Sequence, residues 1–395
     1  MWKDQKEFDC IVVGGGPAGS TFARIAALGG LSVLLLEKDR DIGMPVRCGE
    51  AISDAGIRLF VDPDPRWLAS TIDRIRLIAP DDTEIEFDML EKGYILDRRI
   101  FDYDLAQYAA NEGAIIVTKA YVDGLIIDND NVVGVTGTHI GDRFDIRAKI
   151  IVGADGVESR VGRWAGLKTV LKLKDIESGI QKTVTGIKCQ ENMFDFYISR
   201  KRAPGGYLWV FPKGKNKANI GLGISGYFAK DGKSSRKYLD EFLEEKYPQA
   251  SVLTTVVGGI PVAKTVKQLV GDGIMLVGDA AHACNPLTGG GITPGMRSGL
   301  LAAEAAVKAL HNGGPTKKNL QTYEKSWHKI GGKNHERYYR IKESLYKLDD
   351  IDFNTIAHAV ASIPEDSRTL MKLFSAAVRK KPSLIFDVAR VFAGV

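Results

Sequence analysis

The chain has 395 residues, of which 44% are hydrophobic and 26% charged, an ordinary globular composition with room for two or more domains. Its net charge of +5 is too small to indicate nucleic-acid binding, although clustered basic residues would suit an anionic membrane surface. The four cysteines show no paired spacing, so we expect reduced thiols in a cytoplasmic protein. Among the cysteines and histidines only His282 and Cys284 lie near each other in the sequence, without partners at ligand spacing, so we expect no metal site. The polar start of the chain predicts no signal peptide. No apolar run approaches the roughly 18 residues of a membrane span, so any membrane contact is expected to be peripheral.

The first informative stretch predicts a dinucleotide-binding turn. An apolar strand over residues 11–13 is followed by Gly14-x-Gly16-x-x-Gly19 and by a predicted helix. Glycines at these positions let a pyrophosphate approach the backbone and let the helix pack on the strand, and the helix N-terminus stabilises the phosphate charge. A second strand, 32–36, ends at Glu37, close to the offset of about 20 residues expected of a carboxylate that binds an adenosine ribose. A purely structural glycine turn would leave Glu37 unexplained.

Further along the chain, alternation predicts a β-hairpin over 75–87, where a second, sheet-based domain is expected to begin. A helix over 101–111, a strand over 114–118 and a β-meander through 123–146 follow. Strand patterns dominate from 172 to 259, with one helix at 235–245, and the chain after 314 reads as helical. We therefore expect an α/β fold with a discontinuous dinucleotide-binding Rossmann-like domain (1–72, 94–170 and 260–312), an inserted antiparallel-sheet domain (73–93 and 171–259) and a C-terminal helical region (313–395).

Two further apolar strands end in glycines and a carboxylate. The first leads to Asp155-Gly156, and the second leads to Gly278-Asp279 and a glycine loop, 289–295, which opens a helix. Because ligands of open α/β sheets bind at the carboxyl ends of the strands, Asp279 would reach a ribityl hydroxyl. Free backbone N–H groups of the glycine loop would stabilise negative charge on a reduced flavin ring. NAD explains the first motif but not the third.

Together these motifs resemble the para-hydroxybenzoate-hydroxylase-like FAD flavoproteins. More narrowly, the chain is similar to the geranylgeranyl reductase family, and within it to archaeal-type digeranylgeranylglycerophospholipid reductases, which saturate isoprenoid chains of membrane lipids. Four segments carry this likeness: Pro45-Val-Arg-Cys-Gly-Glu50, the Tyr-x-Trp-x-Phe-Pro string that ends at Pro212, Gly221-x-Gly223, and Gly258-Gly-Ile-Pro261. The resemblance covers about residues 8–310 and is weaker in the C-terminal helices.

The resemblance implies a set of FAD-binding positions on the backbone turns and strand ends: Gly15, Gly16, Ala18, Glu37, Cys48, Gly49, Ala51, Arg98, Val122, Asp279, Gly291 and Ile292. Gly15, Gly16 and Ala18 would hold the pyrophosphate, Glu37 the adenosine ribose, and the Val122 backbone the adenine. Cys48, Gly49 and Ala51 would lie along the ribityl chain and the ring, Arg98 would reach a phosphate or ribityl oxygen, and Asp279 would bind the ribityl-phosphate region. Gly291 and Ile292 would border the isoalloxazine ring. For Arg98 the alternative is an ion pair with Asp102, one helical turn on. For Cys48 the alternative is packing, since a free cysteine is usually buried and inert.

Reduction of an isolated trisubstituted alkene requires a hydride at one carbon and a proton at the other. Tyr207, Trp209 and Phe211 share one face of a strand, where they would line the prenyl chain and stabilise a cation-like carbon, or form ordinary core. The acid would be the Cys48 thiol, a water or Tyr207, and we expect His282 to make a structural hydrogen bond instead. Cys48, Tyr207 and Trp209 are thus the predicted catalytic residues, and Tyr207, Trp209 and Phe211 the predicted substrate contacts.

Two other functions share this scaffold: an FAD-dependent aromatic monooxygenase and a non-catalytic lipid-binding flavoprotein. The Arg-Cys-Gly-Glu loop and the aromatic strand favour the reductase. No second Gly-x-Gly-x-x-Gly marks an NAD(P)H-binding domain, and no cysteine pattern marks an iron–sulfur cluster, so we expect an external electron donor, such as a reductase or ferredoxin-like protein. Residues 372–395 carry two apolar stripes beside Arg379, Lys380 and Lys381, which predicts peripheral contact with the inner face of the cell membrane or packing on the protein body.

Overall fold

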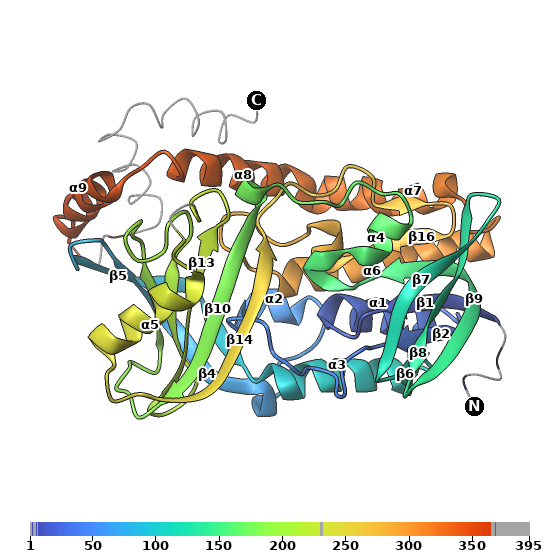
Figure 1. Ribbon diagram of the computed structural model, residues 1–395, viewed down its shortest axis with the longest axis horizontal. Coiled ribbons are helices and arrows are strands. Elements are labelled where there is room, and N and C mark those ends of the chain that lie inside the picture. The colour runs from blue at the N-terminus through green and yellow to red at the C-terminus, as the bar shows by residue number, and fades with distance from the viewer. Residues whose placement is uncertain (1, 3–4, 6, 230–231, 365–367, 369–395) are drawn as a thin grey trace. The chain divides into compact units, whose positions relative to one another are not determined.

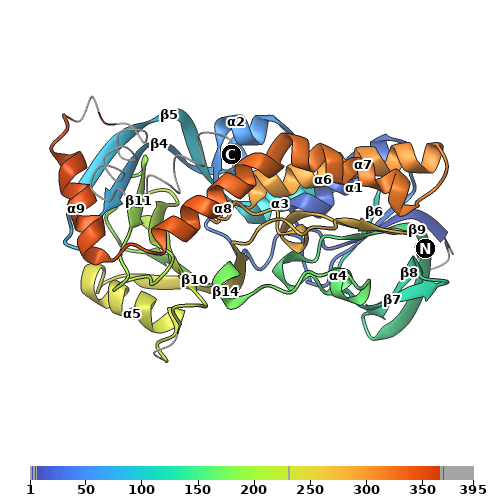
Figure 2. The same cartoon turned by 90° about the horizontal axis from the view of Figure 1, so that it is seen from above.

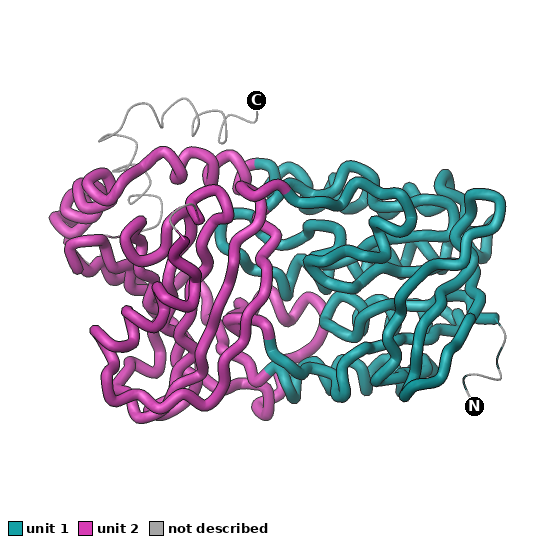
Figure 3. Tube along the Cα trace, viewed as in Figure 1, with its two compact units in different colours: residues 1–46, 98–171, 263–336 teal, residues 47–97, 172–262, 337–395 magenta. Residues whose placement is uncertain are grey.

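The computed structural model describes residues 2, 5, 7–229, 232–364 and 368 (Figure 1). The chain forms two compact units, each assembled from three segments that are separate in the sequence (Figure 3). Unit 1 comprises Met1–Val46, Arg98–Leu171 and Ala263–Glu336, and unit 2 comprises Arg47–Asp97, Lys172–Val262 and Arg337–Val395. Each unit is built on one eight-stranded sheet.

The sheet of unit 1 has the strand order β15-β16-β9-β1-β2-β6, with β7 and β8 as an antiparallel extension of β9. Its central pairings, β16–β9, β9–β1, β1–β2 and β2–β6, are all parallel, so the carboxyl ends of these strands meet at one edge. The strands are β1 (Glu7–Val13), β2 (Val33–Leu36), β6 (Ile115–Val117), β7 (Ala120–Asp128), β8 (Asn131–His139), β9 (Asp142–Gly153), β15 (Val270–Gly271) and β16 (Ile274–Leu276).

Strand β1 is apolar throughout its second half because both of its faces are covered. Cys10 and Val12 belong to a core formed with the helices, whereas Ile11 and Val13 belong to a second core formed with β7, β8 and β9. The helices are α1 (Pro17–Leu28), α3 (Arg98–Asn111), α4 (Arg160–Trp164), α6 (Ile292–His311) and α7 (Lys317–Trp327). Helix α1 packs against α3 and α6, and α6 packs against α7 (Figure 2).

The sheet of unit 2 has the order β14-β10-β13-β12-β11-β4-β5-β3 and is antiparallel except for the β11–β4 pair. Its strands are β3 (Ala51–Ser53), β4 (Leu68–Ile78), β5 (Glu84–Leu96), β10 (Ile176–Thr185), β11 (Met193–Tyr197), β12 (Leu208–Pro212), β13 (Lys217–Ser225) and β14 (Ser251–Pro261), and its helices include α2 (Asp54–Arg58) and α5 (Ser235–Lys246). Helix α5 packs Leu239 and Phe242 on one face of the sheet. The opposite face carries an aromatic cluster that includes Trp209 and Phe211.

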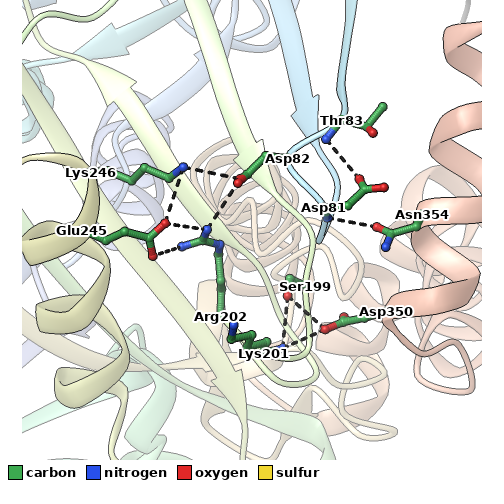
Figure 4. A network of polar contacts seen from close by, with 10 residues as sticks. All are labelled: Asp81, Asp82, Thr83, Ser199, Lys201, Arg202, Glu245, Lys246, Asp350 and Asn354. Atoms are coloured by element: carbon green, nitrogen blue, oxygen red, sulfur yellow. Dashed lines mark hydrogen bonds and ion pairs between the residues drawn. The ribbon is translucent and has the colours of Figure 1, made fainter.

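Helix α9 (Asp350–Ala361) makes polar contacts with the rest of unit 2 through its first two turns (Figure 4). The Asp350 carboxylate accepts the backbone N–H groups of Arg200 at 2.7 Å and Lys201 at 3.3 Å. Asn354 Oδ1 accepts the N–H of Asp81, at the tip of the β4–β5 hairpin, at 3.1 Å. Arg202 pairs with Glu245 of α5 at 2.8 Å, so the same region joins the hairpin, α5 and α9.

The structure confirms the α/β class and the antiparallel second domain, but it moves the boundaries that we expected. Residues 47–72 and 94–97 belong to unit 2 rather than to the FAD-binding domain, because β3 and β4 both hydrogen-bond to β5. Residues 313–336 belong to unit 1, because Tyr323 and Trp327 of α7 lie in its core. The meander strand and the strand before Asp155 are one strand, β9. The amphipathic stretch 372–395 lies outside the described residues.

Candidate functional site

The glycine turn of unit 1 joins β1 to α1, and its glycines meet different constraints. A Cβ added to Gly14, whose φ is +111°, would lie 2.3 Å from the Ala154 carbonyl oxygen, and one added to Gly19 would lie 2.0 Å from the Gly14 oxygen. Gly14 and Gly19 therefore allow the strand and helix to approach each other closely. A Cβ on Gly16 would meet no described atom within 4 Å, and Gly16 caps α1 without a side-chain hydrogen bond. The open, uncapped N-terminus of α1 is the kind of site that binds a phosphate.

Glu37 lies at the end of β2, with its carboxylate directed at this turn. Its Oε2 accepts the Gly15 N–H at 2.8 Å, and its Oε1 accepts the Asp39 N–H at 2.9 Å. The Glu37 carbonyl accepts the N–H of Ala120 at 2.9 Å, which brings the start of β7, and thus Val122, to the same strand end. The predicted ribose and adenine positions therefore come together, and their roles in binding FAD stay predictions.

The second and third carboxylates, Asp155 and Asp279, are short of hydrogen-bond donors. Asp155 Oδ2 accepts the Val161 N–H at 3.0 Å, but its buried Oδ1 has no partner in the part of the chain that the structure describes. The Asp279 carboxylate receives no hydrogen bond from any described residue. Removal from water raises the pKa of both carboxyl groups, and the Arg98 guanidinium opposes this effect at Asp279.

Asp279 also lies beside the glycine loop that opens α6. A Cβ on Gly291 would lie 3.3 Å from Asp279 Oδ1, and α6 starts at Ile292 with no side-chain cap. A Cβ on Gly278 would come 2.9 Å from the Cβ of Ala18, so the third motif packs directly on the first. The three motifs therefore converge, as the strand-end argument predicts.

Arg98 adopts the ion-pair geometry that was the alternative to a cofactor contact. Its Nε and a terminal nitrogen contact Asp102 Oδ1 and Oδ2 at 3.0 and 2.5 Å, and both side chains are largely buried. The paired guanidinium still acts electrostatically on Asp279. A role of Arg98 in binding a phosphate or ribityl oxygen stays a prediction.

The residues of unit 1 fit FAD. The open N-terminus of α1 suits its pyrophosphate, and the donor-poor carboxylates of Asp155 and Asp279 suit hydroxyl groups that donate hydrogen bonds. Gly291 and Ile292 at the uncapped start of α6 would hold the flavin end, where backbone N–H groups favour negative charge.

In unit 2, the loop at Cys48 is anchored to the face of the sheet opposite α5. The Cys48 carbonyl oxygen accepts a hydrogen bond from Gln181 Nε2 at 2.8 Å, and Gln181 Oε1 accepts one from Trp209 Nε1 at 3.0 Å. The Glu50 N–H donates to Cys48 Sγ at 3.2 Å. A Cβ on Gly49 would lie 3.1 Å from the Phe211 ring. Ala51 begins β3 directly after this loop. The predicted flavin contacts Cys48, Gly49 and Ala51 therefore lie beside Trp209 and Phe211, two of the predicted substrate contacts.

The aromatic cluster contains more rings than the sequence indicated. Ring centroids of Tyr207 and Trp209 are 5.8 Å apart, and those of Trp209 and Phe211 are 6.1 Å apart. Phe194 and Phe196 of β11 join them, at 4.8 and 5.3 Å from Phe211. The alternation Phe194-Asp195-Phe196 was the available signal, but the pairing of β11 with β12 is a tertiary fact. The contact of this cluster with a prenyl chain stays a prediction.

A buried polar group that sequence reasoning missed supports the same loop. The Glu50 carboxylate, 1% exposed, pairs with Lys213 and accepts Asn219 Nδ2 at 2.6 Å. Asn219 Oδ1 accepts the Thr183 hydroxyl at 2.7 Å. Glu50 stood in the Arg-Cys-Gly-Glu string that carried the family resemblance, but nothing in the sequence identified its partners.

His282 confirms its expected structural role. Its Nε2 lies 3.0 Å from the Thr169 carbonyl oxygen, and the side chain is buried. Among the described residues, no group of three or more histidine, cysteine or acidic side chains is arranged to hold a metal ion.

Comparison with known proteins agrees with both parts of this site. Residues 12–74 match the model of the NAD(P)-binding Rossmann-like domain, and residues 175–260 match that of the geranylgeranyl reductase catalytic domain. The digeranylgeranylglycerophospholipid reductase of Methanocella arvoryzae is 44% identical over 97% of this chain and 99% of its own length. The Methanosarcina mazei protein of the same name is 40% identical over 98% of this chain and 96% of its own.

Among solved structures, a geranylgeranyl bacteriochlorophyll reductase-like protein from Thermoplasma acidophilum superposes with a TM-score of 0.91 at 34% identity, covering 98% of this chain and 99% of that one. A flavin-dependent brominase superposes with a TM-score of 0.71 at 18% identity, covering 98% and 94%, a likeness that shows the fold alone.

Fold and site together define an FAD-dependent flavoprotein oxidoreductase with a Rossmann-like domain and an antiparallel-sheet domain. Within that class, the chain belongs to the geranylgeranyl reductase family, in which its curated relatives are digeranylgeranylglycerophospholipid reductases. FAD is its cofactor.

Proposed function

We propose that this protein saturates the isolated C=C bonds of geranylgeranyl chains in prenylated glycerophospholipids. The observation that carries this proposal is its 44% identity, over almost the full length of both chains, to a digeranylgeranylglycerophospholipid reductase. Support comes from unit 2, where the Cys48–Gly49 loop packs on Trp209 and Phe211. A long apolar substrate binds against an apolar and aromatic surface of this kind. The flavoprotein fold by itself does not require such a surface.

The chemistry asks the chain to hold an alkene in a dry site and to supply a proton. FAD, in its reduced form, supplies the hydride. The rings of Tyr207, Trp209 and Phe211 exclude water along the prenyl chain, and their π faces stabilise positive charge that develops at the more substituted alkene carbon. Gln181 holds both the Trp209 indole and the Cys48 carbonyl, so the loop and the ring keep one geometry.

The partners and location follow from the substrate. A lipid with two long prenyl chains is almost insoluble in water, so we place the enzyme as a peripheral protein on the inner face of the cell membrane. The helices in the described part of the chain are all too short or too polar to cross a bilayer. An external reductase or ferredoxin-like protein would supply the electrons, and no nucleic acid takes part.

The test is an anaerobic half-reaction. The purified protein is reduced with dithionite, freed of excess reductant, and mixed with detergent-dispersed digeranylgeranyl glycerophospholipid while the flavin absorbance is followed. We expect reoxidation of the flavin, and a gain of two hydrogens per reduced double bond by mass spectrometry. The saturated lipid serves as the control and leaves the flavin reduced.

Each alternative function predicts a different outcome, the monooxygenase in a parallel assay in air and the lipid-binding flavoprotein in the anaerobic half-reaction. An aromatic monooxygenase would consume NAD(P)H and release peroxide or a hydroxylated aromatic product in air. A non-catalytic lipid-binding flavoprotein would bind the prenyl lipid without flavin reoxidation. Either result would reject the reductase.

A further inference from the structure

One carboxyl group in unit 2 has no role in the site described so far. Glu177 lies on β10, 7% exposed, and the alternation of the strand places its side chain on the same face as that of Gln181. A Cβ added to Gly223 of β13 would lie 2.4 Å from Glu177 Oε2, and one added to Gly206 would lie 3.3 Å from the same atom. The carboxyl group therefore lies directly over Gly223 and beside the residue that precedes Tyr207.

The glycines of the Gly221-x-Gly223 motif make room for two functional side chains. A Cβ on Gly221 would lie 2.5 Å from the Trp209 ring, just as one on Gly223 would meet Glu177. Positions two apart on a strand are separated by about 7 Å and face the same side. The Glu177 carboxyl group and the Trp209 ring therefore cover neighbouring positions of one strand, on the face that carries the aromatic cluster.

Glu177 lacks the partners that a buried carboxylate needs. Within the described ranges, its side chain makes no hydrogen bond and no ion pair. Burial raises the pKa of Glu177 from 4.5 to about 7, and Lys342 of helix α8 (Lys333–Leu345) opposes the shift without cancelling it. A carboxyl group in this setting keeps its proton near neutral pH.

The groups around Glu177 do not supply a strong cation. The Lys342 ammonium is shared among the carbonyl oxygens of Val262 at 2.6 Å and Lys174 at 3.3 Å and the Asp175 carboxylate at 3.4 Å. Burial raises the pKa of Tyr346, the residue that follows α8, and a negative charge on Glu177 would raise it further. The Arg47 side chain packs over Gly258 of β14. Gly258 pairs with Gly179 of β10, so Arg47 lies opposite Gly179 and not opposite Glu177. None of these groups offsets the rise in the pKa of Glu177 that burial causes.

We propose that Glu177 is the acid that protonates the alkene of the prenyl substrate. The Glu177 O–H bond breaks and a C–H bond forms at one alkene carbon, using the alkene electron pair. The other carbon accepts the hydride that the proposed reductase function supplies, so the alkene gains one hydride and one proton, which together are two electrons and two protons. The carboxylate left behind regains its proton from water. This assignment rests on the proposed function and replaces Cys48 and Tyr207 as the expected proton donor.

The first test replaces Glu177 with glutamine, which keeps the shape of the side chain and removes the proton. We expect Glu177→Gln to bind FAD and to be reduced by dithionite like the wild type, while reoxidation by the prenyl lipid slows by about 10²–10⁴-fold, the usual contribution of a general acid. The control is Glu191→Gln, at an exposed turn next to β11, which should reoxidise at the wild-type rate. Wild-type turnover should fall as the pH rises through about 7, because only the protonated carboxyl group is active.

The second test does not depend on turnover. Infrared difference spectroscopy of the resting protein at neutral pH should show a protonated carboxyl band that Glu177→Gln lacks and Glu191→Gln retains. Because the folded-state pKa is raised, the neutral carboxyl group favours the folded state fully below about 4.5, and this contribution is lost as the pH rises to about 7. The variant should therefore gain stability relative to the wild type over that range, measured by urea unfolding.

The outcomes separate this proposal from the function on which it rests. If the lipid does not reoxidise the reduced wild-type flavin, the proposed function is rejected. If the wild type turns over and Glu177→Gln turns over within twofold of it, Glu177 is not the acid. A wild-type protein without the carboxyl band rejects a neutral Glu177 whatever the lipid does. Gly223→Ala, which would displace the carboxyl group, should slow lipid-driven reoxidation without lowering FAD content.

Discussion

At the scale of single residues, the carboxylates of unit 1 differ in how many donors they already have. Glu37 accepts two backbone N–H groups, Asp155 accepts one and keeps an unpartnered buried oxygen, and Asp279 accepts none from the described residues. A carboxylate offers about four lone-pair positions, so Glu37 retains capacity for a ribose hydroxyl while its orientation is held by the turn. Its two N–H bonds make Glu37 part of the turn, in addition to the ribose contact that we predict for it.

Replacing Glu37 with alanine should weaken FAD binding by about 1–3 kcal/mol, the cost of hydrogen bonds to a charged group. The measurement is titration of apoprotein with FAD, followed by flavin fluorescence. Asp41→Ala is the matched control, because Asp41 pairs with the exposed Arg40 outside the turn. Equal affinities for the two variants would remove Glu37 from the cofactor site.

Cys48→Ala should lower turnover on prenyl lipid by about fivefold while FAD content stays at the wild-type level. The loop keeps its Gln181 anchor, and only the bond from the Glu50 N–H to Sγ is lost, a contribution of about 1 kcal/mol. A loss of 10²-fold or more would instead make the thiol an acid. Full activity would leave Cys48 with the packing role that was its alternative in the sequence.

At the scale of elements, β10 organises the functional face of unit 2. Three of its side chains on one face contact other parts of the unit: Glu177 lies over Gly223, Gln181 bonds to Trp209 and Cys48, and Thr183 bonds to Asn219. Through Asn219 the strand also reaches the buried Glu50–Lys213 pair. One strand therefore sets the position of the Cys48 loop, the indole ring and the proposed acid.

Lys213→Met should destabilise the protein by about 3–5 kcal/mol, because it leaves the Glu50 carboxylate buried without its cation. Adding Glu50→Gln to the same variant should recover part of the loss, since the uncompensated charge is gone. Chemical denaturation at pH 7 measures both. Lys233→Met, which breaks the more exposed Lys233–Glu241 pair, is the control and should cost less than about 1 kcal/mol. Similar losses at the two lysines would contradict a buried ion pair at Glu50.

At the scale of the whole molecule, the chain crosses between its two units several times. Unit 1 holds the FAD-binding turns and unit 2 the aromatic face, and the first crossing, at Val46–Arg47, stands two residues from Cys48. A lipid substrate must also be delivered from a membrane, and neither the FAD-binding turns of unit 1 nor the aromatic face of unit 2 explains that step. The basic segment at Arg379, Lys380 and Lys381 lies outside the described residues, so the argument for it is one of charge alone.

Neutralising Arg379, Lys380 and Lys381 together, each to glutamine, should weaken binding to anionic vesicles by about 3 kcal/mol, at about 1 kcal/mol per basic residue near the surface. Flotation with phosphatidylglycerol vesicles at low salt measures the bound fraction, and added salt should reverse wild-type binding. Replacing the exposed Lys325, Lys329 and Lys333 by glutamine makes the same change of charge elsewhere and serves as the control. Failure of the wild-type protein to float would rule out peripheral binding and require a carrier for the lipid.

The sequence by itself determined the cofactor side of this protein. The glycine turn, Glu37, Asp155 and Asp279 were predictable because each follows an apolar strand directly, and the carboxyl ends of parallel strands share one edge. The spacing within each motif is local in the sequence. The rule that a ligand-binding group follows the end of a parallel strand then applies to each motif in turn. The resemblance in the Cys48 loop and the aromatic strand then indicated the substrate side.

Only the tertiary structure decided which residues surround that substrate face. Phe196 lies opposite Trp209 and Glu177 lies over Gly223 because β11 pairs with β12, β12 with β13 and β13 with β10. Glu50 reaches Lys213 from the loop that precedes β3. Residues 47–72 join unit 2 for the same reason, since β3 and β4 hydrogen-bond to β5. A buried carboxyl group without a donor cannot be recognised from its neighbours in sequence, because the groups that bury it come from distant strands and helices.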